Sequence, residues 1–164
     1  MFSMCLTVYF ITDHPLPLVE NDTAYPDISV TVPTPEFMEK IRSVVQGDHI
    51  VEAMTSEGCG CGFNVETVEE LEDDLEGVSD EAYCQYSREE WQKRLQWVRS
   101  LNAYVTKVAA AGPFTIYTAW AGEEGFPIKD EFTVAPEYFD GPPFGFGDDG
   151  FGDRRLYHVQ SEVR

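Results

Sequence analysis

Alternating hydrophobic and polar positions predict a set of short β-strands. The run from Met4 to Thr12 is rich in β-branched and aromatic residues on both alternating faces, which is typical of a central strand. The run from Ile28 to Val32 is shorter and predicts an edge strand. Similar runs predict further strands at His49–Thr55, Phe114–Ala121, Glu131–Val134 and Arg155–Val163.

Helical periodicity predicts one long helix and two shorter ones. The long helix is expected to begin at Ser87, in a capping box with Glu90, and to end before Gly112. A short helix is expected to start at Thr34-Pro35 and to be stopped by Gly47. The run from Val65 to Glu81 has hydrophobic residues at helical spacing, which predicts a loosely attached amphipathic helix.

Strands and helices are mixed without regular alternation, so we expect an α+β fold. It should have a single mixed or antiparallel sheet, one long helix packed across it and one or two shorter helices. All 164 residues are expected to form one domain, which includes an acidic segment, 65–82, and a Gly/Phe/Asp-rich loop, 139–153. The residues expected in the core are Leu6, Val8, Phe10, Ile50, Val51, Trp91, Leu95, Val98, Leu101, Ile116 and Tyr117.

The net charge of -19 limits the classes of partner, because 30 acidic residues face only 11 basic ones. Such a surface repels nucleic acid and anionic membranes, and it favours basic proteins or cations. Direct nucleic-acid binding and membrane binding are therefore not expected. The apolar run Met1–Ile11 lacks a basic leader and is too short to span a membrane, so a cytoplasmic location is expected.

The acidity fits three interpretations: adaptation to a high-salt cytoplasm, simple solubility, or a surface that imitates nucleic acid. No complete catalytic constellation is recognisable, so a binding role is favoured over an enzymatic one. The first hypothesis is an acidic protein that engages a basic protein surface, with nucleic-acid mimicry as its stricter form. The acidic surface would include Glu66, Glu69, Glu70, Glu72, Asp73, Asp74, Glu76, Asp80 and Glu81.

The segment Ser56–Phe63 provides the alternative hypothesis, a metal or thiol site. Thiolates one residue apart chelate soft metals, and the glycines around Cys59 and Cys61 let the backbone turn both sulfurs to one point. If the first two long strands pair antiparallel, Cys5 joins them at one edge of the sheet. Zinc would need a fourth ligand, for which Cys84 and His49 are the candidates.

The cysteines of this segment also fit a purely structural role or a redox role. In the structural role, they act as small buried hydrophobic residues in a glycine turn. In the redox role, the thiols are reactive, which requires a lowered thiol pKa; Glu57 and the acidic run after Val65 oppose that.

Four blocks of sequence carry a family resemblance. They are Met4-Cys5 and Asp13-x-Pro15-Leu16-Pro17 near the start, Ser56-x-Gly58-Cys59-Gly60-Cys61-Gly62-Phe63, and Tyr117-x-x-Trp120-x-Gly122-Glu123. Together they resemble a group of small uncharacterised bacterial proteins with a Gly-Cys-Gly-Cys-Gly-Phe motif. The resemblance implies a bacterial cytoplasmic setting and no mechanism. This chain departs from the group in its acidity and in the Phe-Gly-Asp insertion near its C-terminus.

Overall fold

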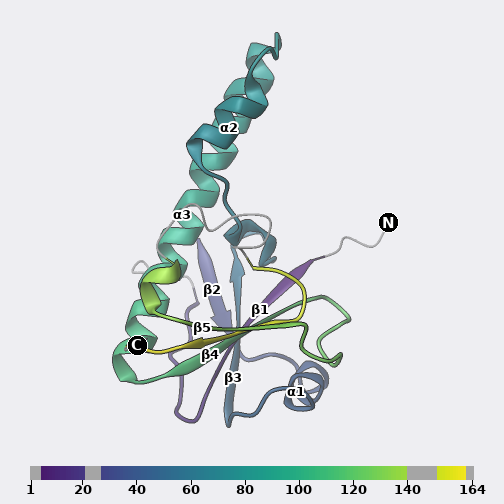
Figure 1. Ribbon diagram of the computed structural model, residues 1–164, viewed down its shortest axis with the longest axis vertical. Coiled ribbons are helices and arrows are strands. Elements are labelled where there is room, and N and C mark those ends of the chain that lie inside the picture. The colour runs from purple at the N-terminus through teal and green to yellow at the C-terminus, as the bar shows by residue number, and fades with distance from the viewer. Residues whose placement is uncertain (1–4, 21–26, 140–150, 162–164) are drawn as a thin grey trace.

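The computed structural model describes residues 5–20, 27–139 and 151–161, and in these ranges it has an α+β fold with one mixed six-stranded sheet (Figure 1). The sheet order is β2-β3-β1-β4-β6-β5, in which only β5 and β6 are parallel neighbours. The strands are β1 (Leu6–Thr12), β2 (Ile28–Thr31), β3 (His49–Thr55), β4 (Phe114–Trp120), β5 (Asp130–Val134) and β6 (Arg155–Val159).

The helices cover both faces of this sheet. The long helix α3 (Glu81–Ala111) lies across one face and the short helix α1 (Pro35–Arg42) covers the other (Figure 1). A third helix, α2 (Val68–Leu75), packs against the N-terminal half of α3. Two short 3-10 turns, Cys61–Phe63 and Pro136–Phe139, complete the regular structure of the described residues.

Strand β1 is central, as its two apolar faces predict. Leu6, Val8 and Phe10 point into the core under α3, together with Leu101 of that helix. Tyr9 and its neighbour Ile11 point the other way, into the smaller core under α1. The alternation of β1 therefore builds a three-layer arrangement, with the sheet between its helices.

The predicted edge strand is confirmed, because β2 lies at one end of the sheet. The short helix begins at Pro35 as expected, although the side chain of its N-cap residue Thr34 makes no capping hydrogen bond. It ends at Arg42 rather than near Gly47. The middle of the expected Gly/Phe/Asp-rich loop, residues 140–150, lies outside the described residues, and Phe151 after it packs into the main core.

The predicted start of the long helix is wrong. Helix α3 begins at Glu81, six residues before Ser87, and Asp80 caps it by accepting a hydrogen bond from the backbone N–H of Tyr83 at 3.1 Å. Tertiary contact favours the extra turns, since Cys84 packs against Leu71 and Leu75 of α2. Ser87 is consequently an interior helical residue rather than a cap.

The core prediction fails at Trp91. The other ten residues expected in the core are buried, whereas Trp91 is half-buried and packs against α2, outside the two cores that flank the sheet. The helix instead buries Trp97 and Tyr104 in the main core. The N-terminal part of α3, which includes Trp91, extends beyond the sheet (Figure 1). The apolar stripe predicted from the sequence therefore has no sheet to pack against at that residue.

The N-terminal half of α3 and the whole of α2 form a projecting unit, residues 65–94, which we call the arm. In Figure 1 the arm extends beyond the end of the sheet. The part of α3 from Glu81 to Arg94 adds roughly 20 Å to the length of the molecule, at 1.5 Å per residue. The distal surface of the arm is too far from the sheet to pack in either of the two cores.

Candidate functional site

The cysteine turn lies against the start of β1. Strands β1 and β3 pair antiparallel, so the last residue of β3, Thr55, lies beside the first residue of β1, Leu6. The backbone N–H of Gly60 donates to the carbonyl oxygen of Leu6 at 2.9 Å, and that of Leu6 donates to the Cys61 sulfur at 3.1 Å. The turn is therefore joined to β1 through both backbone and sulfur.

Three thiols meet at this point. The backbone N–H of Cys61 donates to the Cys59 sulfur at 3.2 Å, and the Cys59 side chain also forms hydrogen bonds with the side chains of Cys5 and Cys61. All three residues are partly exposed, and all four cysteines of the chain are free thiols. The sequence predicted Cys5, Cys59 and Cys61 at one edge of the sheet, whereas the structure places all three at the start of β1, which is an interior strand of the sheet.

Only glycine fits between the two cysteines of the turn. A Cβ atom at position 60 would lie 2.6 Å from the carbonyl oxygen of Leu6 and 2.9 Å from a methyl group of Val8. Backbone atoms of a central strand have little freedom to move away. The Cys-Gly-Cys order is thus required by the close approach of the turn to β1.

The environment of Cys59 favours its neutral form. Burial is the largest cause that raises the pKa of this thiol, and its hydrogen bond with the Cys61 side chain raises that pKa further. The backbone N–H of Cys61 and the Cys5 side chain act in the opposite direction. A raised pKa does not suit a free reactive thiolate, in agreement with the reasoning from Glu57 and the acidic run.

The two residues considered as a fourth ligand lie elsewhere. Cys84 is buried between α2 and α3, where its thiol donates to the carbonyl oxygen of Val78 at 3.9 Å. His49 pairs with Thr12 at the far end of β1. Neither joins the three thiols, and nowhere in the described ranges do three His, Cys, Asp or Glu side chains form a ready metal site.

The acidic residues singled out from the sequence are all on the arm. Glu66 precedes α2, Glu76 follows it, and Asp80 and Glu81 start α3. Eight of the nine are exposed, and Glu66 is half-buried. The five on α2 itself are Glu69, Glu70, Glu72, Asp73 and Asp74.

Some of these carboxylates have structural roles. Glu70 completes a capping box, in which its carboxylate accepts from the backbone N–H of Thr67 at 2.8 Å. Glu72 accepts two hydrogen bonds from Arg88 of α3, at 2.7 and 2.6 Å, and this guanidinium lowers the pKa of the Glu72 carboxyl. By contrast, Asp73 and Asp74 form no ion pair within the described part of the chain.

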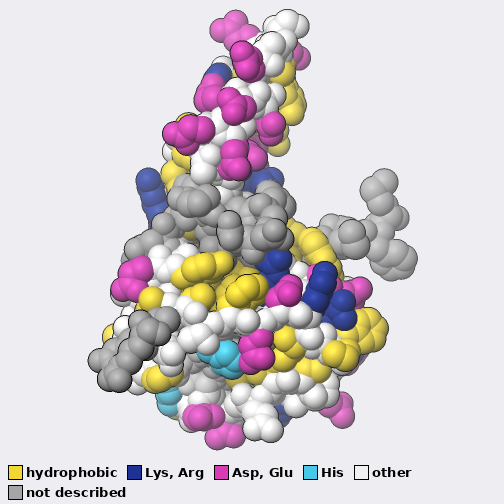
Figure 2. Space-filling model, viewed as in Figure 1, with side chains coloured by type: hydrophobic (Ala, Val, Ile, Leu, Met, Phe, Trp, Pro, Cys, Tyr) yellow, Lys and Arg dark blue, Asp and Glu magenta, His cyan; other side chains and the backbone are white. Residues whose placement is uncertain are grey.

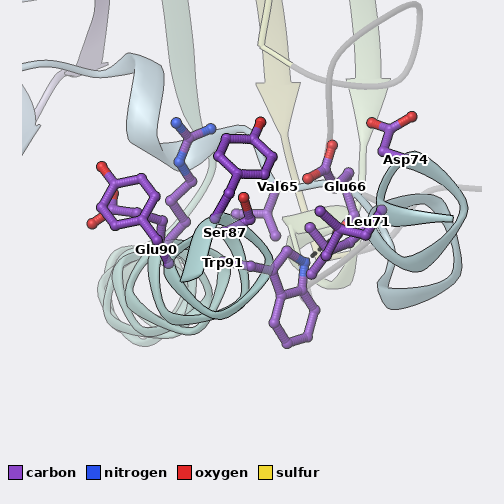
Figure 3. Close-up of a pocket in the computed structure, with 11 residues that line it drawn as sticks. Val65, Glu66, Leu71, Asp74, Ser87, Glu90 and Trp91 are labelled. Atoms are coloured by element: carbon purple, nitrogen blue, oxygen red, sulfur yellow. Dashed lines mark hydrogen bonds between the residues drawn. The ribbon is translucent and has the colours of Figure 1, made fainter. Parts of the chain in front are cut away.

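A groove of about 270 Å³ lies between α2 and α3. Figure 3 shows Trp91 reaching from α3 toward Leu71 of α2, while its indole N–H donates to the backbone carbonyl of Glu66 at 2.9 Å. Two tyrosines of α3 border the groove, and their exposed fractions are 55% for Tyr83 and 60% for Tyr86. The charged side chains of its lining are Glu66, Asp74, Glu90 and Arg94.

Sequence reasoning missed this groove. It ended the acidic segment at residue 82 and started the long helix at Ser87, so Tyr83 and Tyr86 fell outside both elements. Their spacing of three residues puts them on one helical face, which was the available signal once Asp80 is read as the N-cap.

Comparison with known proteins gives no relative: no family model, no curated protein and no solved structure matches this chain. The resemblance to the bacterial group with the Gly-Cys-Gly-Cys-Gly-Phe motif therefore stays a prediction. Among the described residues, no helix has both the length and the apolar character needed to cross a membrane.

Proposed function

We propose that the arm is a binding module for a basic protein surface. The observation that carries this proposal is the concentration of charge on the arm. Between Val65 and Arg94 the sequence has eleven acidic and three basic residues. Figure 2 shows acidic side chains distributed along the visible face of the arm, with hydrophobic side chains along one of its edges.

This distribution favours binding over general adaptation to salt. A charge that only maintains solubility is expected to spread evenly over the surface. Here, a segment of 30 residues holds more than a third of the 30 acidic side chains, while the remaining 134 residues share the rest. Clustered carboxylates repel one another, and that repulsion is relieved when a cationic partner binds.

The groove indicates the chemistry of the partner. Exposed tyrosines beside carboxylates suit a segment that presents lysine or arginine next to an apolar side chain, because the aromatic faces contact both the apolar group and the cation. The apolar side chain would enter between Tyr83, Tyr86 and Trp91. The cationic groups would pair with Asp74 and the neighbouring carboxylates of α2.

Nucleic-acid mimicry is the stricter form of this function. In that form the partner is a protein whose basic site normally holds phosphates, and the arm competes with nucleic acid for it. Competition with duplex DNA for binding to a panel of basic nucleic-acid-binding proteins tests it. Binding at moderate salt that DNA displaces supports mimicry, whereas no binding to any of them contradicts it.

Fluorescence anisotropy with two labelled helical peptides tests the general proposal. One peptide contains Lys and Leu on opposite faces, and the other contains Lys and Gln with the same length and charge. The Lys/Leu peptide is expected to bind about tenfold more tightly, because burial of one Leu side chain contributes about 1.5–3 kcal/mol, part of which is lost to ordering. Equal affinity of the two peptides would contradict a role for the groove.

Matched variants distinguish the contribution of the acidic charge to peptide binding from that of the groove. The triple variant Asp73→Asn, Asp74→Asn, Glu76→Gln should weaken both peptides, and the double variant Tyr83→Ser, Tyr86→Ser should remove only the preference for Leu. The control neutralises three exposed carboxylates away from the arm, Glu39→Gln, Asp48→Asn and Glu137→Gln. If the control weakens binding as much as the arm variant does, net charge alone is responsible and the proposal is wrong.

A further inference from the structure

The cluster of Cys5, Cys59 and Cys61 lies outside the arm and is unused by the proposed function. Three partly exposed cysteines lie at the start of β1, and backbone N–H groups donate to the sulfurs of Cys61 and Cys59. Thiols that only fill a core need no such donors. Donors of this kind are more typical of sulfurs that bind a ligand.

The donors favour sulfur in its negatively charged form. Leu6 N–H lies 3.1 Å from the Cys61 sulfur, and Cys61 N–H lies 3.2 Å from the Cys59 sulfur. Hydrogen bonds to a thiolate stabilise it, and they also tune thiolates that bind metals. The Cys59 sulfur also lies 4.0 Å from the carbonyl oxygen of Leu6, so both sulfurs of the turn lie beside the same residue of β1. A cation bound between them would balance the charge of the two thiolates.

The ligand set distinguishes between metals. Structural zinc takes four ligands, and both Cys84 and His49 lie away from the cluster. Soft thiolate sulfur also selects Cu(I), a monovalent cation that is satisfied by two or three sulfur ligands. Two sulfurs from one Cys-Gly-Cys turn, with Cys5 beside them, meet that smaller requirement.

We propose that Cys59 and Cys61 bind one Cu(I) ion between their two sulfurs. Each thiol that coordinates the ion releases its proton, and the oxidation state of copper does not change. Gly60 keeps the turn against β1 so that both sulfurs face the same point. The partial exposure of the three cysteines leaves the ion a path in from solvent.

Anaerobic titration with Cu(I) held by the chromogenic chelator bicinchoninate tests the proposal. The wild-type protein is expected to withdraw one equivalent of copper and to develop ultraviolet thiolate-to-copper absorption. Cys59→Ser and Cys61→Ser should each abolish this withdrawal, whereas Cys5→Ser keeps both ligands and should retain it. Circular dichroism melting of each variant without copper shows whether its fold is kept.

The matched control is Cys84→Ser, which removes a thiol outside the cluster. It should still withdraw one equivalent of copper, and if it is unstable, Cys84→Ala serves instead. Failure of the wild-type protein to compete with the chelator overturns the proposal, as does full copper binding in folded Cys59→Ser. One equivalent of zinc bound in preference to Cu(I) would overturn the choice of metal. None of these results depends on the arm, so the two proposals fail independently.

Discussion

The indole N–H of Trp91 donates a hydrogen bond to the backbone carbonyl of Glu66, across 25 residues of sequence and at 2.9 Å. This bond ties the segment that precedes α2 to the helix on which α2 rests. With the bidentate pair of Arg88 and Glu72, it holds together an arm that has only a small apolar contact of its own. The arm is thus ordered by a few identifiable interactions.

Trp91→Phe is expected to loosen the arm while the main core stays intact. Phenylalanine keeps most of the packing on Leu71 but leaves the Glu66 carbonyl without its donor, at a cost of about 1 kcal/mol. Amide hydrogen exchange in α2 should become about fivefold faster, because that free-energy change acts on local opening. Tyr86→Phe, on the exposed side of the same helix, is the control and should leave this exchange unchanged. Unaltered exchange in Trp91→Phe would mean that the bond does not order the arm.

Leu101→Ala should destabilise the whole fold. Leu101 is buried in the main core beneath α3, so the substitution leaves a cavity and should cost about 2–5 kcal/mol in urea unfolding. Leu18→Ala is the control, since Leu18 is 52% exposed and should change stability by no more than about 0.5 kcal/mol. Equal effects of the two substitutions would show that α3 does not pack on the sheet as described.

Gly62→Ala should also be destabilising, through overpacking. A Cβ atom at position 62 would lie 2.5 Å from two ring atoms of Trp97, which is itself buried in the main core. The expected cost is about 1–3 kcal/mol, measured as the free energy of unfolding. At Gly125 the nearest atoms to such a Cβ are 3.7 Å away, so Gly125→Ala should be tolerated. A neutral Gly62→Ala would indicate that the Trp97 ring has room to move.

Glu52→Gln should stabilise the protein at neutral pH. Burial is the main cause that raises the pKa of the Glu52 carboxyl, and the nearby Glu124 raises it further. A raised folded-state pKa means that the folded state binds this proton more tightly, so stability is lost as the pH rises through that pKa. Thermal melting should therefore show a higher midpoint for Glu52→Gln at pH 7.

The same comparison at low pH provides the internal check. Below the ordinary glutamate pKa of about 4.3, Glu52 is protonated in both the folded and unfolded states, and the advantage of glutamine should disappear. Glu39→Gln is the control, since Glu39 is exposed and its substitution should change the melting midpoint little. A stabilisation by Glu52→Gln that is equal at both pH values would point to packing rather than charge.

The alternation of apolar and polar residues was sufficient to predict the strands of the sheet and the α+β fold class. The two apolar faces of β1 indicated a central strand, and the antiparallel pairing with β3 that the cysteine hypothesis assumed is present. The same pairing brings Cys5 to the Cys-Gly-Cys turn. The strand predictions succeeded because the two-residue alternation of a strand is a local pattern that the sequence shows directly.

The arm was less predictable, because its limits depend on tertiary contact. The extra turns of α3 exist where Cys84 packs on Leu71 and Leu75, a contact between two helices that sequence periodicity alone does not specify. Trp91 and Trp97 are six residues apart and lie on helical faces about 120° apart, so the packing of α3 on the sheet decides which of them is buried in the main core. The groove depends on both features and was therefore missed.

Hydrogen-exchange mass spectrometry of the full chain, with and without the Lys/Leu peptide, tests the central claim most directly. We expect slower exchange upon binding in α2 and in the part of α3 from Glu81 to Arg94, and no change in β1 or β4. The protection should diminish as salt rises, because charge attraction contributes to it. Protection spread over the sheet, or bound peptide with an unprotected arm, would contradict the assignment of binding to the arm.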